Sequence, residues 1–222
     1  MGVELRLATG ADVPEMARLC RENAAKGGEP FHSFPALAPP LFLEPYLELQ
    51  PTHCWVAVGE RGLVGYAVGA ADTRRHRRLE RRLLLRRLPH LLSSLRPTSI
   101  PSRGALRSLA HWARRLSMGG MRDPTVERYI DLGRFPAHAH LQVRKELAPP
   151  TTGLGLMVKL QKSFVEAGAR GQHGLAAEPE DQRRYWRMMQ ALGARPVHQW
   201  ERLTDEGTNI ISVAFEMQLR KS

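Results

Sequence analysis

Residues 137–168 read AHAHLQVRKELAPPTTGLGLMVKLQKSFVEAG, and they contain the strand and the helix from which the fold is inferred. Its first part, Ala137–Val143, is typical of a strand. Its last part, Leu156–Ala167, carries apolar residues at helical spacing and predicts a helix, which Gly168 ends as a C-terminal cap. The pair Gly153-Leu154-Gly155 therefore lies at a strand-to-helix junction.

The glycine pair has two physical interpretations. The first turn of a helix carries N–H groups without intrahelical acceptors and the positive end of the helix dipole, so it binds phosphate oxygens through the backbone. Glycine lets the main chain approach such an anion closely. The alternative is that Gly153 and Gly155 only shape a turn, and their spacing alone leaves both interpretations open.

Outside this stretch, strands alternate with helices around one segment of different composition. Asp12 is a candidate N-cap, with Glu15 completing a capping box, and Gly59-Glu60-Arg61-Gly62 connects the clearest hairpin. The predicted elements are a strand at 3–7, a helix at 12–25, a Gly- and Pro-rich loop at 27–45, a short helix at 41–49, hairpin strands at 54–58 and 63–68, a helical insertion at about 72–133, a strand at 173–177, a helix at 181–192 and a closing hairpin of 196–203 with 210–219.

This order of elements resembles the GNAT superfamily of acyl-CoA N-acyltransferases over residues 1–70 and 134–219. Within it, Phe135–Leu141 is similar to the Tyr-Pro-Ala-His-Leu-His segment of a bacterial GNAT subgroup related to the acetyltransferase-like domain of O-GlcNAcases. The resemblance implies an α/β GNAT fold in a single domain, residues 1–222. Its central sheet is mixed and mostly antiparallel, flanked by helices, with a helical insertion between strands 3 and 4.

The resemblance also implies acetyl-CoA, or another acyl-CoA, as cosubstrate. The superfamily pattern Gln/Arg-x-x-Gly-x-Gly/Ala falls on Pro150–Gly155, and Pro150 removes both the usual side chain and an N–H donor. Backbone groups of the preceding strand are expected to align the pantetheine arm. The expected cofactor-binding residues are Leu141, Gln142, Val143, Thr151, Thr152, Gly153, Leu154 and Gly155.

Two residues are candidates for catalysis. Histidine suits a general base for the attacking amine, and His140 matches the second histidine of the subgroup segment. His138, two residues earlier, is expected on the same side of the strand. Many superfamily members carry an aromatic pair whose Tyr protonates the departing thiolate, but Met188-Met189 aligns there. Tyr185, one turn earlier, is the candidate substitute.

Other interpretations of these residue types remain open or disfavoured. A strand histidine or a helix tyrosine is often a core residue, and Glu146 is a weaker, solvent-facing candidate base. The pair His138 and His140 has no third ligand at a telling spacing, so no metal is expected.

The net charge of +11 is concentrated in the insertion. Residues 72–96 contain nine Arg and two acids, a charge of +7, which leaves +4 for the remainder. Leucines between the arginines are expected to pack on the domain or to pair two subunits as a homodimer. The arginines suit an acidic carrier protein, a membrane surface or nucleic acid. Nucleic acid is disfavoured because the segment lacks interleaved aromatic residues.

The remaining composition is that of a globular protein. No apolar run has the roughly 20 residues of a membrane span, and Met1–Arg6 is not a secretion signal. The two cysteines, Cys20 and Cys54, offer no disulfide framework. We expect a reduced, cytoplasmic protein.

The leading hypothesis is an N-acyltransferase that moves an acetyl or other acyl group from acyl-CoA to a small-molecule amine by direct attack. The first alternative is a catalytically weakened GNAT-like module that only binds acyl-CoA. The second is an acyltransferase whose donor is an acyl carrier protein.

Overall fold

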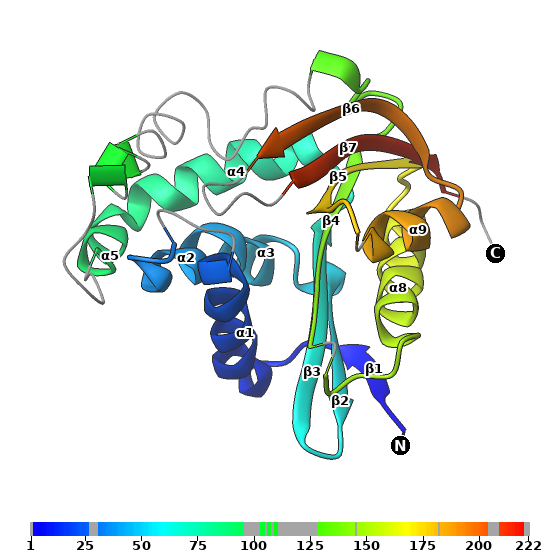
Figure 1. Ribbon diagram of the computed structural model, residues 1–222. Coiled ribbons are helices and arrows are strands. Elements are labelled where there is room, and N and C mark those ends of the chain that lie inside the picture. The colour runs from blue at the N-terminus through cyan, green and yellow to red at the C-terminus, as the bar shows by residue number, and fades with distance from the viewer. Residues whose placement is uncertain are drawn as a thin grey trace. The chain divides into compact units, whose positions relative to one another are not determined.

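A computed structural model describes residues 2–26, 31–95, 103–104, 106–107, 109–110, 128–144, 146–181, 183–203 and 209–219. The chain separates into two compact units. The first unit contains residues 1–69, 75–122 and 140–160, and the second contains 70–74, 123–139 and 161–222. Figure 1 traces the order of the elements through them.

The strands form a seven-stranded sheet in the order β1-β2-β3-β4-β5-β7-β6. Pairing is antiparallel between β1 and β2, β2 and β3, β5 and β7, and β6 and β7, while β4 and β5 are parallel. This confirms the predicted mixed, mostly antiparallel sheet. The strands are β1 (Glu4–Leu7), β2 (Cys54–Gly59), β3 (Gly62–Ala70), β4 (Ala137–Val143), β5 (Gly171–Pro179), β6 (Arg195–Leu203) and β7 (Asn209–Gln218).

In the first unit, the predicted β2–β3 hairpin has a tighter turn than its sequence indicates. Gly59 and Gly62 pair across the strands, so only Glu60 and Arg61 form the connection. Gly62 has φ +98°, a conformation that glycine adopts without steric cost. The four-residue connection was wrong because both flanking glycines belong to the ladder.

Helix α1 (Val13–Lys26) is confirmed, but its predicted capping box is not. Asp12 lies in a preceding 3-10 turn, where its carboxylate accepts hydrogen bonds from the N–H and Oγ1 of Thr9, each at 2.8 Å. It also forms an ion pair with Arg6 at 2.7 Å. Glu15 instead pairs with Arg18.

The segment predicted as a long loop at 27–45 is helical in much of its described part. A 3-10 turn at Pro35–Leu37 leads into α2 (Ala38–Phe42) and α3 (Glu44–Leu49). Each of the three begins with Pro in its first turn, where a missing N–H removes no helical hydrogen bond. Proline here starts helices, and the loop prediction was wrong for that reason.

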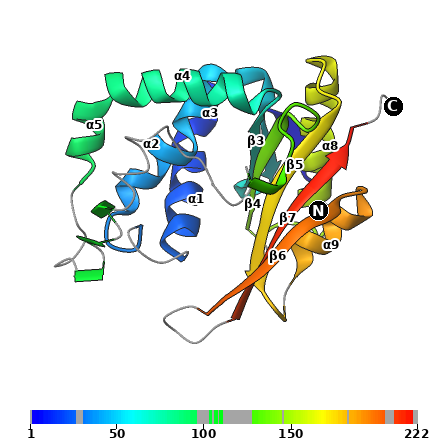
Figure 2. The ribbon, with the colours of Figure 1, turned by 90° about the horizontal axis from the view of Figure 1, so that it is seen from above.

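The described part of the insertion contains α4 (Thr73–Arg86) and α5 (Leu88–Ser93). Figure 2 shows α4 running past α3. Arg87, between the two insertion helices, bonds Glu44 of α3 at 2.8 Å and also bonds the Glu48 carboxylate. The α4 arginines other than the half-buried Arg77 face solvent, while Leu83 and Leu84 are buried. Most of the predicted insertion beyond residue 95 lies outside the described residues.

The second unit contains the strands β5, β7 and β6 and the helix α9 (Arg184–Ala191). Gly174 of β5 leaves room for the Phe215 ring, because a Cβ there would lie 2.5 Å from it. Helix α8 (Thr152–Glu166) contributes residues to both units. Among the described helices, none combines the length and the apolar composition that crossing a membrane requires.

Candidate functional site

Helix α8 begins at Thr152, four residues before the predicted start. Both glycines therefore lie inside its first turn, and not in a loop before it. The Thr152 N–H donates to Pro149 O at 3.0 Å, and the Gly155 N–H donates to Thr151 O at 2.9 Å. By helix geometry, the N–H groups of Gly153 and Leu154 are the ones directed out of the helix start.

Gly155 and Thr152 of this turn have different environments. A Cβ on Gly155 would lie 2.7 Å from Leu5 Cδ1, so glycine lets α8 pack closely on β1. Thr152 is only 4% exposed, and its Oγ1 has no hydrogen-bond partner within the described part of the chain. A buried hydroxyl without a partner is destabilising unless a ligand supplies one. The turn thus offers Thr152 Oγ1 and the Gly153 and Leu154 N–H groups to an anion.

Strand β4 changes its partners along its length. Its register with β5 pairs Ala137 with Gln172 and His138 with His173. The part from His140 to Val143 belongs to the first unit, where Leu141, Gln142 and Val143 are half-buried. A Cβ on Gly65 of β3 would lie 2.9 Å from Gln142 O, so β3 closely approaches this part of the strand.

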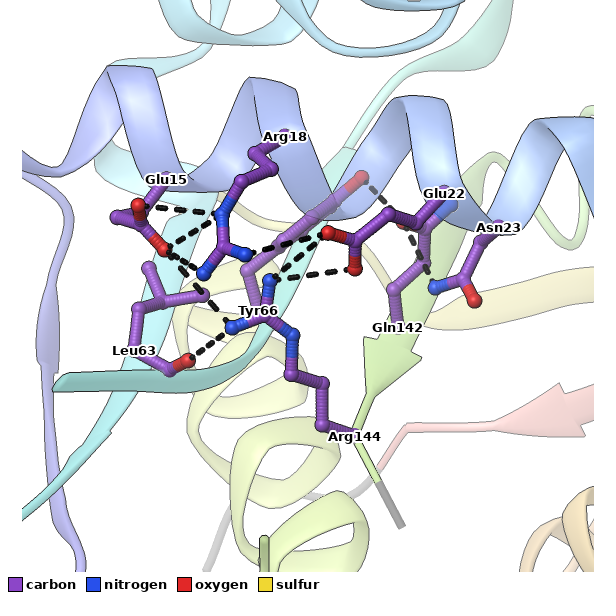
Figure 3. Close-up of polar contacts among 8 residues, drawn as sticks. All are labelled: Glu15, Arg18, Glu22, Asn23, Leu63, Tyr66, Gln142 and Arg144. Carbon is purple, nitrogen blue, oxygen red and sulfur yellow. Dashed lines mark hydrogen bonds and ion pairs between the residues drawn. The ribbon is translucent and has the colours of Figure 1, made fainter. Parts of the chain in front are cut away.

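The side chain of Gln142, a predicted cofactor residue, is engaged within the protein (Figure 3). Its Oε1 accepts hydrogen bonds from Tyr66 OH at 2.7 Å and from Asn23 Nδ2 at 3.3 Å. Arg144, just past the strand, bonds Leu63 O at 3.3 Å and Glu22 Oε2 at 3.2 Å. These contacts tie α1 and the β2–β3 hairpin to the end of β4, and they occupy the side-chain oxygen of Gln142.

His140 belongs to the same unit as the α8 turn and keeps solvent access. Its ring meets Tyr46 of α3 edge to face, with centroids 5.4 Å apart. Although the residue is exposed, the surrounding protein lowers the pKa of His140 below its ordinary value by desolvation. The imidazole is therefore neutral at pH 7 and able to accept a proton.

Sequence reasoning missed the groups behind His140. Tyr46 stacks on His76 of α4 with centroids 4.5 Å apart, and Glu80 follows one helical turn after His76. All three are buried. The available signal was the spacing of His76 and Glu80, which places them on one helix face among arginines.

His138 has a structural role in the second unit. Thr73 Oγ1 donates to Pro136 O at 2.6 Å and lies 2.6 Å from His138 Nδ1. Because the hydroxyl proton goes to the carbonyl, His138 Nδ1 is the donor in the second contact. His173 Nδ1 likewise donates to Phe135 O at 2.6 Å. Both imidazoles are therefore fixed with a protonated Nδ1.

The candidate acid Tyr185 lies on α9 in the second unit. Its N–H donates to Glu178 Oε1 at 2.8 Å, and its ring lies 6.5 Å from that of Phe215. Burial, followed by the Glu178 charge, raises the pKa of Tyr185, so the phenol is protonated at neutral pH. Met189 is fully buried core. Because Tyr185 and His140 belong to different units, their catalytic pairing stays a prediction.

The other predicted site residues are exposed or half-buried. Glu146 is exposed. Thr151 and Leu154 are exposed and Gly153 is half-buried. Within the described residues, no group of three or more His, Cys, Asp or Glu side chains is arranged to hold a metal ion.

No protein-family model matches the chain. Among solved structures, the crystal structure of SsHAT is similar with a TM-score of 0.69 and 18% identity over 100% of both chains. A GCN5-related N-acetyltransferase from Kribbella flavida has a TM-score of 0.53 and 17% identity over 98% of each chain. A GNAT superfamily phosphinothricin acetyltransferase from Sinorhizobium meliloti, in complex with acetyl-CoA, has a TM-score of 0.53 and 17% identity over 99% of this chain and 89% of that one. These likenesses establish the GNAT fold, whereas the O-GlcNAcase-related subgroup stays a prediction.

Proposed function

We propose that this protein is an acyl-CoA-dependent N-acyltransferase that acts on the amine of a small molecule. The observation that carries the proposal is the first turn of α8, where the buried Thr152 hydroxyl has no partner in the described part of the chain. The GNAT fold adds support, since the S. meliloti protein of that fold was solved with acetyl-CoA. The turn belongs to the same unit as His140.

The α8 turn would hold the pyrophosphate of acetyl-CoA. The Gly153 and Leu154 N–H groups and the Thr152 hydroxyl supply donors, and the helix dipole adds a favourable field. Thr151 is exposed and adds a hydroxyl at the same end. Gly155 contributes indirectly, because its missing side chain lets α8 pack on Leu5. The backbone of Leu141–Val143 would hydrogen-bond the pantetheine amides.

His140 would act as the general base. As the amine nitrogen forms its bond to the acyl carbon, the bond from that carbon to sulfur breaks, and the nitrogen loses a proton that His140 accepts. The lowered pKa of His140 keeps its imidazole neutral and ready for this step at pH 7. The thioester supplies an acyl group activated for transfer. Holding the two reactants in contact supplies much of the acceleration.

Tyr185 would return a proton to the departing thiolate. Its raised pKa keeps the phenol protonated at neutral pH, as this role requires. Water is the alternative proton source. We also propose membership of the O-GlcNAcase-related bacterial subgroup, a single functional domain and a cytoplasmic location.

Calorimetric titration with acetyl-CoA and with CoA tests the proposal. We expect micromolar binding of both ligands, weakened in Thr152→Val, which removes the hydroxyl and keeps the volume. Lys162→Met, an exposed position later in the same helix, is the matched control and keeps the affinity. The proposal is wrong if neither ligand binds. Binding without turnover on a panel of amines would identify the binding-only module.

An acidic acyl carrier protein as donor is the second candidate. It is favoured by six exposed arginines along α4: Arg74, Arg75, Arg78, Arg81, Arg82 and Arg86. Arg77 is half-buried beside Glu80 and does not belong to this surface. The exposed Leu85, Leu88 and Leu92 offer the alternative of homodimer contacts. Faster transfer from an acylated carrier than from acetyl-CoA, lost when Arg78, Arg81 and Arg82 are replaced by Glu, would support the carrier.

A further inference from the structure

Three aromatic rings from three elements of the first unit form a stack that ends on His140. The rings of Tyr46 on α3 and His76 on α4 are nearly parallel, with centroids 4.5 Å apart and planes at 18°. Tyr46 and His140 of β4 meet edge to face, with centroids 5.4 Å apart and planes at 65°. Parallel stacking and edge-to-face contact are both favoured ring geometries.

The inner two rings lie in the protein interior. Tyr46 is 5% exposed and His76 is 1% exposed, whereas His140 is exposed. Side chains in a close-packed interior have fixed rotamers. The orientation of Tyr46 is therefore set by packing, and the His140 ring contacts a rigid surface.

Ion pairs hold the helix of Tyr46 against the insertion. Glu44 and Glu48, which precede and follow Tyr46 on α3, both bond the guanidinium of Arg87. Arg87 comes directly after α4, the helix that carries His76. The stack is thus fixed both by packing and by a charged clamp between its two helices.

The stack also lies among buried titratable groups. Burial raises the pKa of Glu80 to about 7, although Arg77 opposes the shift. Burial lowers the pKa of His76 to about 4, and His140 and Arg77 act in the same direction. Burial, followed by the Glu80 charge, raises the pKa of Tyr46. These groups therefore interact electrostatically with one another and with His140.

We propose that Tyr46 and His76 are positioning residues that hold the His140 imidazole in its catalytic orientation. Tyr46 contacts His140 directly, and His76 acts through Tyr46. The buried face of α4 then supports the active site through His76, whatever partner the exposed arginines of α4 bind. The inference rests on the proposed function for the role of His140 as base.

The first experiment needs no activity. In full-length protein with ¹⁵N-labelled histidine, the His140 signals are those that disappear in His140→Gln. We expect Tyr46→Leu to move the ring signals of His140 and to bring its pKa toward the ordinary value, whereas Tyr46→Phe, which keeps the ring, leaves both unchanged. His76→Leu tests the same stack from α4 and replaces Tyr46→Leu if that variant does not fold. Unchanged His140 signals in the Leu variant that folds would overturn the inference.

The second experiment separates positioning from general packing. We expect Tyr46→Leu and His76→Leu to lower kcat about ten- to a hundredfold, since small displacements of a catalytic group have effects of that size. Affinity for acetyl-CoA should not change, and Tyr46→Phe should restore kcat to within about threefold. Phe42→Leu is the control, because Phe42 of α2 lies outside the stack. Its ring packs on that of Phe31, with centroids 4.9 Å apart.

An equal loss of kcat in Phe42→Leu and Tyr46→Leu would reduce Tyr46 to a packing residue and contradict the proposal. If the wild-type chain binds no acetyl-CoA, the proposed function fails instead. The histidine signals then still decide whether Tyr46 orients His140, so the two failures are distinguishable.

Discussion

The part of β4 in the second unit and the part in the first unit each place a histidine in a different environment. In the second unit, His138 has its Nδ1 fixed by the Thr73 hydroxyl and lies beside His173, with ring centroids 5.8 Å apart. In the first unit, His140 is exposed and rests on the Tyr46 ring. One imidazole is part of a hydrogen-bonded scaffold, and the other has the solvent access that proton transfer requires. Both residues are histidines of one strand. Their different roles therefore follow from their neighbours and not from residue type or secondary structure.

The largest effect is expected from removing the exposed histidine. We predict that His140→Ala lowers kcat/KM for acetyl transfer by about 10²–10⁴-fold, the usual contribution of a general base. Affinity for acetyl-CoA should be retained, because the predicted phosphate donors lie on α8. Steady-state kinetics and calorimetry measure the two quantities. Undiminished turnover in this variant would show that His140 is not the general base, and the proposed functional difference between His140 and His138 would then be wrong.

Replacing the other histidine should affect folding and not chemistry. We predict that His138→Leu lowers the free energy of unfolding by about 1–2 kcal/mol, through a lost hydrogen bond and a lost ring contact. Its kcat should stay within about threefold of wild type.

A double-mutant cycle in urea unfolding sharpens this result. Thr73→Val removes the hydroxyl that accepts from His138, so the cycle with His138→Leu should show a coupling of about 1 kcal/mol. A loss of kcat in His138→Leu as large as that in His140→Ala would contradict the distinction between the two histidines of β4.

A smaller effect is expected in the α8 turn, where the first unit carries its predicted phosphate donors. Gly153→Pro removes one N–H in a helical turn that tolerates proline, and Gly153→Ala keeps the N–H as the matched control. We predict a fall in acetyl-CoA affinity of about fivefold for Pro relative to Ala, the equivalent of one hydrogen bond. Circular dichroism checks that the helix persists in both. Equal affinities would assign phosphate binding elsewhere.

The fold was predictable where local pattern and tertiary structure agree. Strand β4 has the predicted boundaries, Ala137–Val143, and the closing hairpin lies within one residue of its predicted limits at all four ends. The start of α8 was not predictable in the same way. Gly153 suggested a loop, but residues of a first turn need no intrahelical N–H partner, so the helix extends through it.

The candidate site was only partly predictable, because its parts meet through tertiary contacts. His140 and the α8 turn follow from the resemblance to a family. Tyr46 and His76 are separated by 30 residues, and His76 is surrounded in sequence by arginines that suggested a solvated face. Their spacing places His76 and Glu80 on one helix face, but the structure was needed to show that this face is buried.

The smallest effect concerns the pH dependence of stability in the stack behind His140. The pKa of His76 is lowered to about 4, so the unfolded chain binds more protons than the folded one between about pH 6.5 and 4, and stability falls as pH falls through that range. The pKa of Glu80 is raised to about 7, so the folded chain binds more protons between about pH 4.5 and 7, and this contribution instead weakens as pH rises. Each group contributes a slope of at most about 1.4 kcal/mol per pH unit, and the two slopes oppose each other.

The free energy of unfolding in urea, measured from pH 5 to 7.5 in two variants, distinguishes the contribution of His76 from that of Glu80. His76→Leu removes the loss on acidification and leaves the Glu80 contribution, so its stability relative to pH 7.5 should be higher at pH 5 than that of wild type. Glu80→Gln removes the opposing contribution and should make the loss on acidification steeper. His90→Gln, at an exposed position on α5, is the control and keeps the wild-type profile. Parallel profiles in all four proteins would mean that His76 and Glu80 keep their ordinary pKa values in the fold, and burial of the stack would then leave its titratable groups unperturbed.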